Sequence, residues 1–359
     1  MTPEDKIVCL CTRQNFGETH QQQLLNLGQS QEIQWNEVYD TAEQNQVSPL
    51  VYTNLLKCQG EALAIPPAVL NKFKKSYIHN VFVKKGTAAI LEKILALFAQ
   101  KGIEVMLIKG EALNAVVYEQ PWYTISYDVD LVIKARADEL DQADHGQIVE
   151  TLEAFNHQRN EFKEHIEYDY YEHHDMTMNK VLAIDSARLW AEARKIQMYG
   201  YDVWVLPPED MLIAAAINSC RKRFFRLKSL GDIAAIIDKY PHLNWDMLVS
   251  KARAYECNTI LYTALSVTQM TLGCPAPEGV WRRLGVNPVR SLAINYLAHK
   301  LCQNNSLSEL FTRSESTMFG REFSWPLMLT YATYRIDHLL PKLGEIYRAW
   351  RNPPPPVPV

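Results

Sequence analysis

Two acidic residues stand inside a short hydrophobic segment, and this feature constrains the fold of the chain most strongly. Asp128 and Asp130 flank Val129, and residues 131–133 are all hydrophobic. Along a β-strand, side chains at positions i and i+2 point to the same face, so both carboxylates project together. Two close carboxylates repel each other unless a cation lies between them or one is protonated, and burial raises that cost. The pattern therefore predicts a buried strand whose paired acids bind a hard cation such as Mg²⁺, which prefers oxygen ligands.

A second hydrophobic segment, residues 105–108, precedes this strand and is bounded by Gly102 and Gly110. We expect a buried strand there, followed by a helix at about residues 111–118. A glycine between a strand and a helix lets a phosphate group approach the backbone, where the N–H groups and dipole of the helix face the anion. Lys109 places a positive charge beside that position.

The rest of the chain is predicted to be mostly helical, with two further strands. Hydrophobic spacing and breaking residues predict helices around residues 36–44, 68–83, 87–100 and 137–155, and again through most of residues 209–350. The additional strands are expected at 181–185 and 201–206. Four consecutive prolines at 353–356 predict an extended tail.

These elements predict an α/β fold of the α+β kind, in which a small mixed sheet lies between two helical parts. We expect an N-terminal helical region at 1–80, a core at 81–206, a C-terminal helical domain at 207–350 and a Pro-rich tail at 351–359. The active cleft is expected between the core and the C-terminal helices, because clefts between domains are common ligand sites.

Composition excludes several classes of partner. Hydrophobic residues make up 47% of the chain, charged residues 22%, and the net charge is -4, which argues against nucleic acid and anionic membranes as partners. No run of about 18 hydrophobic residues predicts a membrane span, and the polar N-terminus does not resemble a signal peptide. Seven scattered cysteines without a CxxC pair indicate a reducing compartment, so a cytoplasmic location is expected.

Four motifs in order resemble the polymerase-beta-like nucleotidyltransferase superfamily, and more narrowly the bacterial group called uncharacterised nucleotidyltransferase family 5. They are Lys109-Gly110, the segment 128–133, Ile184-Asp185 and the segment 208–212. The resemblance covers roughly residues 20–270 and includes residues 226–233. It implies that the core at 81–206 is a nucleotidyltransferase-like domain.

The resemblance also implies a reaction and its residues. Asp128 and Asp130 would bind one or two Mg²⁺ (or Mn²⁺) ions with a nucleoside triphosphate (NTP), and Asp185 would complete the second metal site and help activate the acceptor hydroxyl. The enzyme would move a nucleoside monophosphate from the NTP to a small-molecule, sugar or peptide acceptor and release pyrophosphate. The expected nucleotide-binding residues are Lys109, Gly110, Glu111, Arg226 and Lys228, and a structural role at the helix start stays open for Glu111.

Three further segments are open to two interpretations each. Residues 221–228 hold five basic side chains, which suit either a phosphate clamp or a solvated helix face. Residues 171–175 contain two adjacent histidines, which point apart on a strand and so do not readily bind one metal ion. Trp122 and Tyr123 lie between the glycine turn and the acid pair, where they either stack on a base or pack against the protein.

Departures from the family pattern motivate alternative functions. Glu111 stands where many superfamily members have serine, Thr124 where many have arginine, and residues 186–188 replace an expected His-Trp pair. One alternative is a catalytically inactive scaffold that binds a nucleotide or a partner. Another is a different group transfer in natural-product biosynthesis, because a fold does not fix a function.

Overall fold

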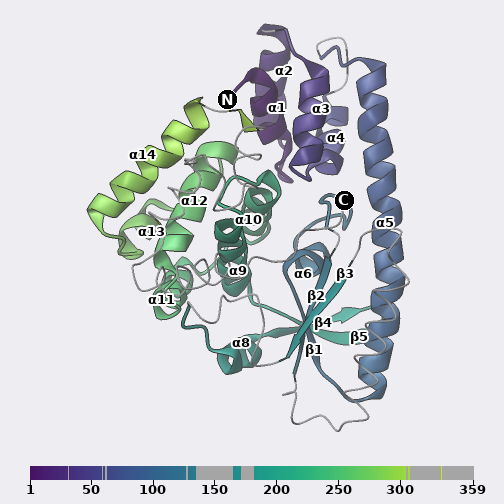
Figure 1. Ribbon diagram of the computed structural model, residues 1–359, viewed down its shortest axis with the longest axis vertical. Helices are drawn as coiled ribbons and strands as arrows, with labels where there is room; N and C mark the ends of the chain where they lie inside the picture. Colours follow the sequence, from purple (N-terminus) through teal and green to yellow (C-terminus); the bar gives the residue numbers. More distant parts are fainter. Residues whose placement is uncertain are drawn as a thin grey trace, which may run out of the picture.

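The protein contains a small sheet with helices on either side of it, confirming the predicted α+β class (Figure 1). The computed structural model describes residues 1–134 except 31, 59, 61, 62 and 127, the strand at 165–170, residues 182–307 except 305, and residue 333. In Figure 1 the first helices lie at the top, the sheet lies below them, one long helix runs along the right side, and the C-terminal helices lie to the left.

The N-terminal region is helical, as predicted, and its helices pack on one another. The helices are α1 (Pro3–Cys11), α2 (Glu18–Ser30), α3 (Trp35–Gln44) and α4 (Ser48–Lys57). Thr2 and Asp5 form a capping box at the start of α1, where each side chain accepts from the other residue's backbone N–H. Arg13, just beyond α1, pairs with Asp238 at 2.8 Å and so joins this region to the C-terminal helices.

The two helices predicted at about 68–83 and 87–100 form one continuous helix, α5 (Pro67–Gln100), of 34 residues. The prediction of a break was wrong, because an interior glycine such as Gly86 costs only about 1 kcal/mol in a helix, and tertiary contacts offset it. The first half of α5 packs against α3 and α4, and the second half reaches the sheet at β5 (Tyr201–Val205). The expected division at residue 80 therefore falls inside this helix.

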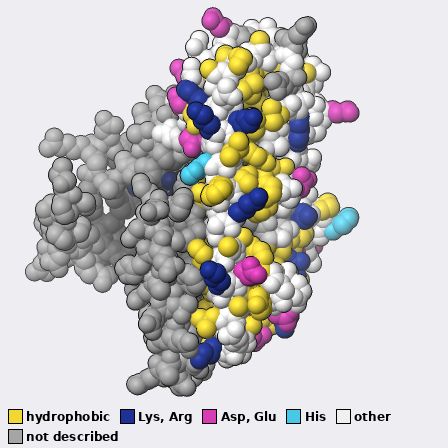
Figure 2. All heavy atoms as spheres, turned by 90° about the vertical axis from the view of Figure 1, so that its right-hand side faces the viewer, with side chains coloured by type: hydrophobic (Ala, Val, Ile, Leu, Met, Phe, Trp, Pro, Cys, Tyr) yellow, Lys and Arg dark blue, Asp and Glu magenta, His cyan; other side chains and the backbone are white. Residues whose placement is uncertain are grey.

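Figure 2 views the molecule from the side of α5, where hydrophobic side chains alternate with lysines and arginines. Ile78 and Phe82, one turn apart on α5, are 53% and 73% exposed. None of the helices in the described ranges is long and apolar enough to cross a membrane.

The sheet has five strands in the order β3-β2-β1-β5-β4. The strands are β1 (Val105–Ile108), β2 (Asp128–Ile133), β3 (His165–Tyr170), β4 (Arg194–Met198) and β5. Strand β1 pairs antiparallel with β2 and parallel with β5, while β2 pairs parallel with β3, so the sheet is mixed as predicted. The predicted strands at 105–108 and 129–133 are confirmed, and their burial explains why nearly all of their residues are hydrophobic.

One strand prediction was wrong, and two strands were not predicted. Residues 182–185 are not a strand; they lead into helix α8 (Ser186–Glu192), and the third strand is β3 instead. The short hydrophobic run before Asp185 is equally compatible with a loop that enters a helix. The strand predicted at 201–206 is β5, and it forms a hairpin with the unpredicted β4 through Tyr199 and Gly200, whose φ angles are +51° and +84°.

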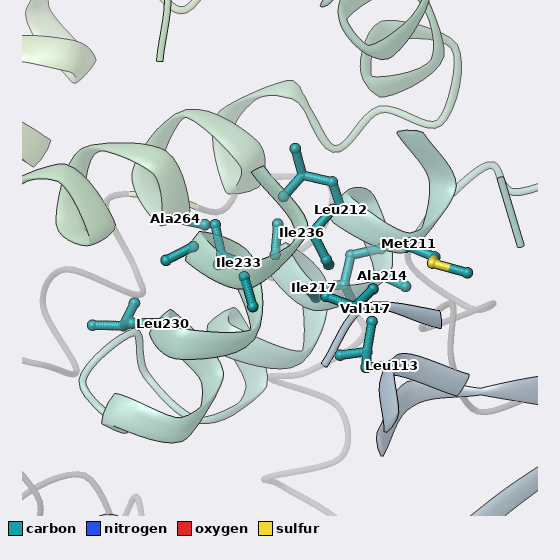
Figure 3. Close-up of a cluster of buried hydrophobic side chains, with 14 of the residues drawn as sticks. Leu113, Val117, Met211, Leu212, Ala214, Ile217, Leu230, Ile233, Ile236 and Ala264 are labelled. Atoms are coloured by element: carbon teal, nitrogen blue, oxygen red, sulfur yellow. The ribbon is translucent and has the colours of Figure 1, made fainter. Parts of the chain in front are cut away.

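After the sheet, the described part of the chain is helical, as predicted. Helix α6 (Lys109–Val116) follows β1, and the C-terminal helices are α9 (Pro208–Arg221), α10 (Leu227–Lys239), α11 (Trp245–Ala254), α12 (Asn258–Leu272), α13 (Glu278–Arg283) and α14 (Pro288–Asn304). Figure 3 shows Leu113 and Val117 of the α6 segment beside Met211, Ala214 and Ile217 of α9. This contact fixes the sheet and the C-terminal helices on either side of one cavity.

Candidate active site

A cavity of about 360 Å³ lies between the sheet and the C-terminal helices, where the active cleft was expected. The sheet side contributes the end of β1, the start of α6 and the acidic start of β2. The opposite side is formed by α9, α10 and the turn between them. The charged side chains that line it are Lys109, Asp128, Asp130, Arg221, Lys222, Arg226, Lys228 and Asp232. The volume lies in the range of small-ligand pockets, roughly 300–1,000 Å³.

Both predicted acids of β2 lie on the cavity wall, and they differ in exposure. Asp130 is only 5% exposed, whereas Asp128, the first residue of the strand, is exposed. Because they stand two residues apart on one strand, they share the face that looks into the cavity. One acid is thus anchored in the protein while the other reaches the open part of the site.

The turn from β1 into α6 places Lys109 and Gly110 next to these acids. The Nζ atom of Lys109 lies 2.5 Å from Asp130 Oδ1. Gly110 packs so closely against Ser126 that an added Cβ would come within 2.8 Å of Ser126 Oγ. Ser126 Oγ in turn donates to Asp128 Oδ1 at 2.9 Å. Because Gly110 has no side chain, it leaves room for the serine hydroxyl to make this bond.

Glu111, predicted to contact the nucleotide, lies elsewhere. It is 5% exposed, is absent from the cavity lining, and accepts from Lys84 of α5 at 2.5 Å and from Asn114 at 3.1 Å. The buried ion pair with Lys84 neutralises the charge that would otherwise repel a triphosphate. This placement fits the structural role left open for Glu111.

The basic segment 221–228 holds the end of α9, the turn that follows it and the start of α10, so it is not one solvated helix face. Arg223 and Phe224 have φ angles of +56° and +63°, which reverse the chain between α9 and α10. Phe224 and Phe225 are 0% and 1% exposed, as expected for inward-facing aromatic residues. Their burial holds the turn in place, and the basic side chains at residues 221, 222, 226 and 228 line the cavity.

The charges across the cavity act on Asp128. Burial of its carboxyl group would raise its pKa, but the hydrogen bond from Ser126 and the positive charges of Lys228 and Lys109 outweigh that effect, so the pKa lies below its ordinary value. Lys228 also lies 3.5 Å from Asp232, which accepts from the buried Tyr118 hydroxyl at 2.7 Å. The helical wall therefore presents positive charge toward the acids.

Asp185, the predicted third acid, is not brought to the cavity. It is exposed, precedes α8, and accepts from the backbone N–H groups of Ala187 and Arg188, at 2.9 Å and 3.4 Å. Helix α8 is tied to the C-terminal helices because Lys251 of α11 pairs with both Glu192 and Asp210. Within the described ranges, no group of three His, Cys, Asp or Glu side chains is arranged to hold a metal ion.

The other sequence features singled out above lie outside the cavity or outside the described residues. Trp122 donates its indole N–H to the Tyr77 hydroxyl at 2.8 Å, and neither Trp122 nor Tyr123 lines the cavity, so these aromatic residues pack against the protein. Thr124 is buried, and its carbonyl accepts from Asn80 of α5. Residues 171–175, the predicted helix at 137–155 and the Pro-rich tail lie outside the described residues.

A family model described as "Uncharacterised nucleotidyltransferase" matches residues 31–273, more than half of the chain. The protein belongs to this family. No curated protein and no solved structure matches the chain. The matched range contains the β1–α6 turn, the acids of β2 and the basic segment 221–228, which are the parts that form the cavity. Membership supports nucleotidyl transfer in general as the type of reaction.

Strand β3, which borders the acidic strand β2, was not predicted from the sequence. Its backbone pairs in register with β2, with His165 opposite Asp128 and Glu167 opposite Asp130. The alternation of polar residues at 165, 167 and 169 with Ile166, Tyr168 and Tyr170 is the period-two pattern of a strand, and it could have revealed this element.

Proposed function

We propose that this protein transfers a nucleoside monophosphate from an NTP to the hydroxyl of a small-molecule, sugar or peptide acceptor. The bond from the acceptor oxygen to the α-phosphorus forms while the bond to pyrophosphate breaks. The observation that carries the proposal is the cavity itself, with Asp128 and Asp130 on one wall and the basic residues of the 221–228 segment on the other. Opposed acidic and basic walls suit a triphosphate that reaches the acids together with a cation.

The donor set on β2 fits a divalent metal ion. Mg²⁺ is commonly bound by one or two carboxylates together with substrate phosphates and water, rather than by a complete cage of protein ligands. Asp130 and Asp128 would hold the ion, the first from a buried position and the second from the cavity surface. When bound, the ion would supply positive charge that neutralises the reacting phosphates.

The remaining cavity residues would bind and orient the triphosphate. Arg226 suits bidentate contact with phosphate oxygens, and Lys228 offers a compact charge from the first turn of α10. Gly110 opens the start of α6, where backbone N–H groups favour an anion. Ser126 holds the Asp128 carboxylate in its orientation through the 2.9 Å hydrogen bond.

Calorimetric titration with each NTP, with and without Mg²⁺, tests the proposal, followed by transfer assays that use an NTP labelled at the α-phosphate. We expect metal-dependent binding of one preferred NTP that is lost in Asp128→Asn and Asp130→Asn. Asp40→Asn, an exposed acid on α3, is the matched control and should behave as the wild type. Full turnover by either β2 variant would refute the proposal.

The third acid needs its own experiment, because Asp185 caps helix α8 and does not line the cavity. Asp185→Asn should retain turnover, since Asn also caps helices well. A loss of turnover by about 10²- to 10⁴-fold in this variant would restore Asp185 as the third acid.

A scaffold without transfer activity is the second candidate, and one observation favours it. Lys109 already neutralises Asp130 at 2.5 Å, so the acids do not require a metal ion to be compensated. The absence of binding for every NTP in the calorimetric test would support this candidate. The charge of Glu111 was a second reason for an inactive scaffold. The ion pair with Lys84 neutralises that charge, so this reason carries less weight.

A further inference from the structure

Lys109 forms an ion pair with Asp130, one of the two carboxylates that would hold a metal ion. Its Nζ atom lies 2.5 Å from Asp130 Oδ1, and the two side chains are 17% and 6% exposed. A metal ion at Asp130 and the ammonium group at this oxygen would stand within a few ångströms of each other, where like charges repel. Metal binding at Asp130 therefore requires Lys109 to move.

The backbone at Lys109 has an uncommon conformation. Its φ angle is +53°, whereas the neighbouring Gly110, which would adopt a positive φ without steric cost, does not have one. For a residue with a Cβ this left-handed conformation is strained. Such outliers cluster at functional sites, so the strained position of this lysine, one residue after β1, suggests a role in ligand binding.

The cavity lining is positively charged without a metal ion. Five basic side chains and three carboxylates line it, so positive charge is in excess. A divalent ion alone would add to that excess in a partly enclosed space. A metal ion that arrives with a triphosphate brings its own negative charge, and the phosphate offers the ammonium group of Lys109 a new partner.

We propose that Lys109 is an internal counter-cation that occupies Asp130 until a metal–triphosphate complex enters, and that its ammonium group then transfers to the triphosphate. The inference rests on the proposed function for the identity of the ligand. Metal alone binds weakly, because it must displace Lys109 without providing a phosphate. Metal and triphosphate bind as a unit, and each raises the affinity for the other by the same factor.

The experiment measures Mn²⁺ binding without nucleotide by electron paramagnetic resonance, on the full chain. Lys109→Met should bind Mn²⁺ about 10-fold more tightly than the wild type, within the usual range of such couplings. Lys109→Asn is a second variant, because Asn tolerates the left-handed conformation and guards against a folding defect. Lys134→Met removes a lysine that pairs with Glu104 outside the cavity, and it should leave the affinity unchanged.

A second titration uses the Mn²⁺ complex of inorganic triphosphate. Here Lys109→Met should bind more weakly than the wild type, so the variant changes the two affinities in opposite directions. Unchanged or weaker binding of Mn²⁺ alone by both Lys109 variants would overturn the inference, as would the absence of Mn²⁺ binding in every protein. A gain in Mn²⁺ affinity without any nucleotidyl transfer would sustain the inference and refute the proposed function, so the two failures are distinguishable.

Discussion

Two lysine–carboxylate pairs flank Gly110, and they have the same length in different surroundings. Lys84 lies 2.5 Å from Glu111, and Lys109 lies 2.5 Å from Asp130. In the first pair the side chains are 3% and 7% exposed, and neither lines the cavity. In the second pair both line the cavity, and the lysine is 17% exposed. Only the second pair has room for a ligand.

This difference separates a structural ion pair from an exchangeable one. A buried charge that loses its partner has no water or ligand to replace it, so the pair joins α5 to the start of α6 permanently. At the cavity, a phosphate or a metal ion can take the place of either partner. The Lys84–Glu111 pair therefore holds the turn at Gly110 in place, while the Lys109–Asp130 pair leaves the cavity side of that turn available to a ligand.

The largest expected effect is the loss of stability on breaking the buried Lys84–Glu111 pair. Glu111→Gln should lower the free energy of unfolding by about 3–5 kcal/mol, because it leaves the buried ammonium group of Lys84 unpaired. Lys109→Met should lower it by less, about 1–3 kcal/mol, since the Asp130 carboxylate that it leaves without the lysine lines the cavity, where water can reach it. Urea unfolding followed by circular dichroism measures both values.

A double variant serves as the control for this comparison. Lys84→Met with Glu111→Leu removes both buried charges and should recover most of the stability that Glu111→Gln loses, because replacing a buried ion pair by hydrophobic residues is often neutral. Equal losses of stability for Glu111→Gln and Lys109→Met would show that the two pairs do not differ in the way their exposure suggests.

A smaller effect is expected at Gly110 itself, which stands between the two pairs. The Cβ of Gly110→Ala would lie 2.8 Å from Ser126 Oγ, so the serine must rotate and give up its hydrogen bond to Asp128. The loss should be about 1 kcal/mol. Adding Ser126→Ala removes the clash, so the double variant should tolerate the alanine with no further loss beyond that of Ser126→Ala alone. An unchanged stability in Gly110→Ala would show that the close approach is not limiting.

Local patterns were sufficient to predict the acidic wall of the site. Alternation around Val129 placed Asp128 and Asp130 on one strand face, and the glycine after the hydrophobic run at 105–108 located the turn into α6. The basic residues of the helical wall were also noticed, because they cluster in sequence. These features depend on neighbours within a few residues, which a sequence displays directly.

Features that depend on distant partners could not be predicted in the same way. The partner of Glu111 is Lys84, 27 residues earlier, and no local pattern links them. A short hydrophobic run precedes Asp185 and resembles the sequences of the strands. Only the structure shows that Asp185 caps helix α8. The residue paired with Asp130 depends on strand register, and β3 lies beyond a long connection.

The smallest expected effect is a change in the pKa of Asp128, which lines the cavity together with the Lys109–Asp130 pair. Its folded-state pKa lies below the ordinary value of 3.8, so the ionised group contributes stability above that pH and loses it as the pH falls through the folded pKa. Lys228→Met removes a positive charge that lowers this pKa, so it should raise the pKa of Asp128 and move the loss of stability to higher pH. Carbon-13 NMR of the Asp128 carboxyl group measures the shift, and Lys134→Met, outside the cavity, should leave it unchanged. An unaltered pKa in Lys228→Met would place Lys228 too far away to act on the acids, and the helical wall would then have to bind phosphate without interacting with Asp128.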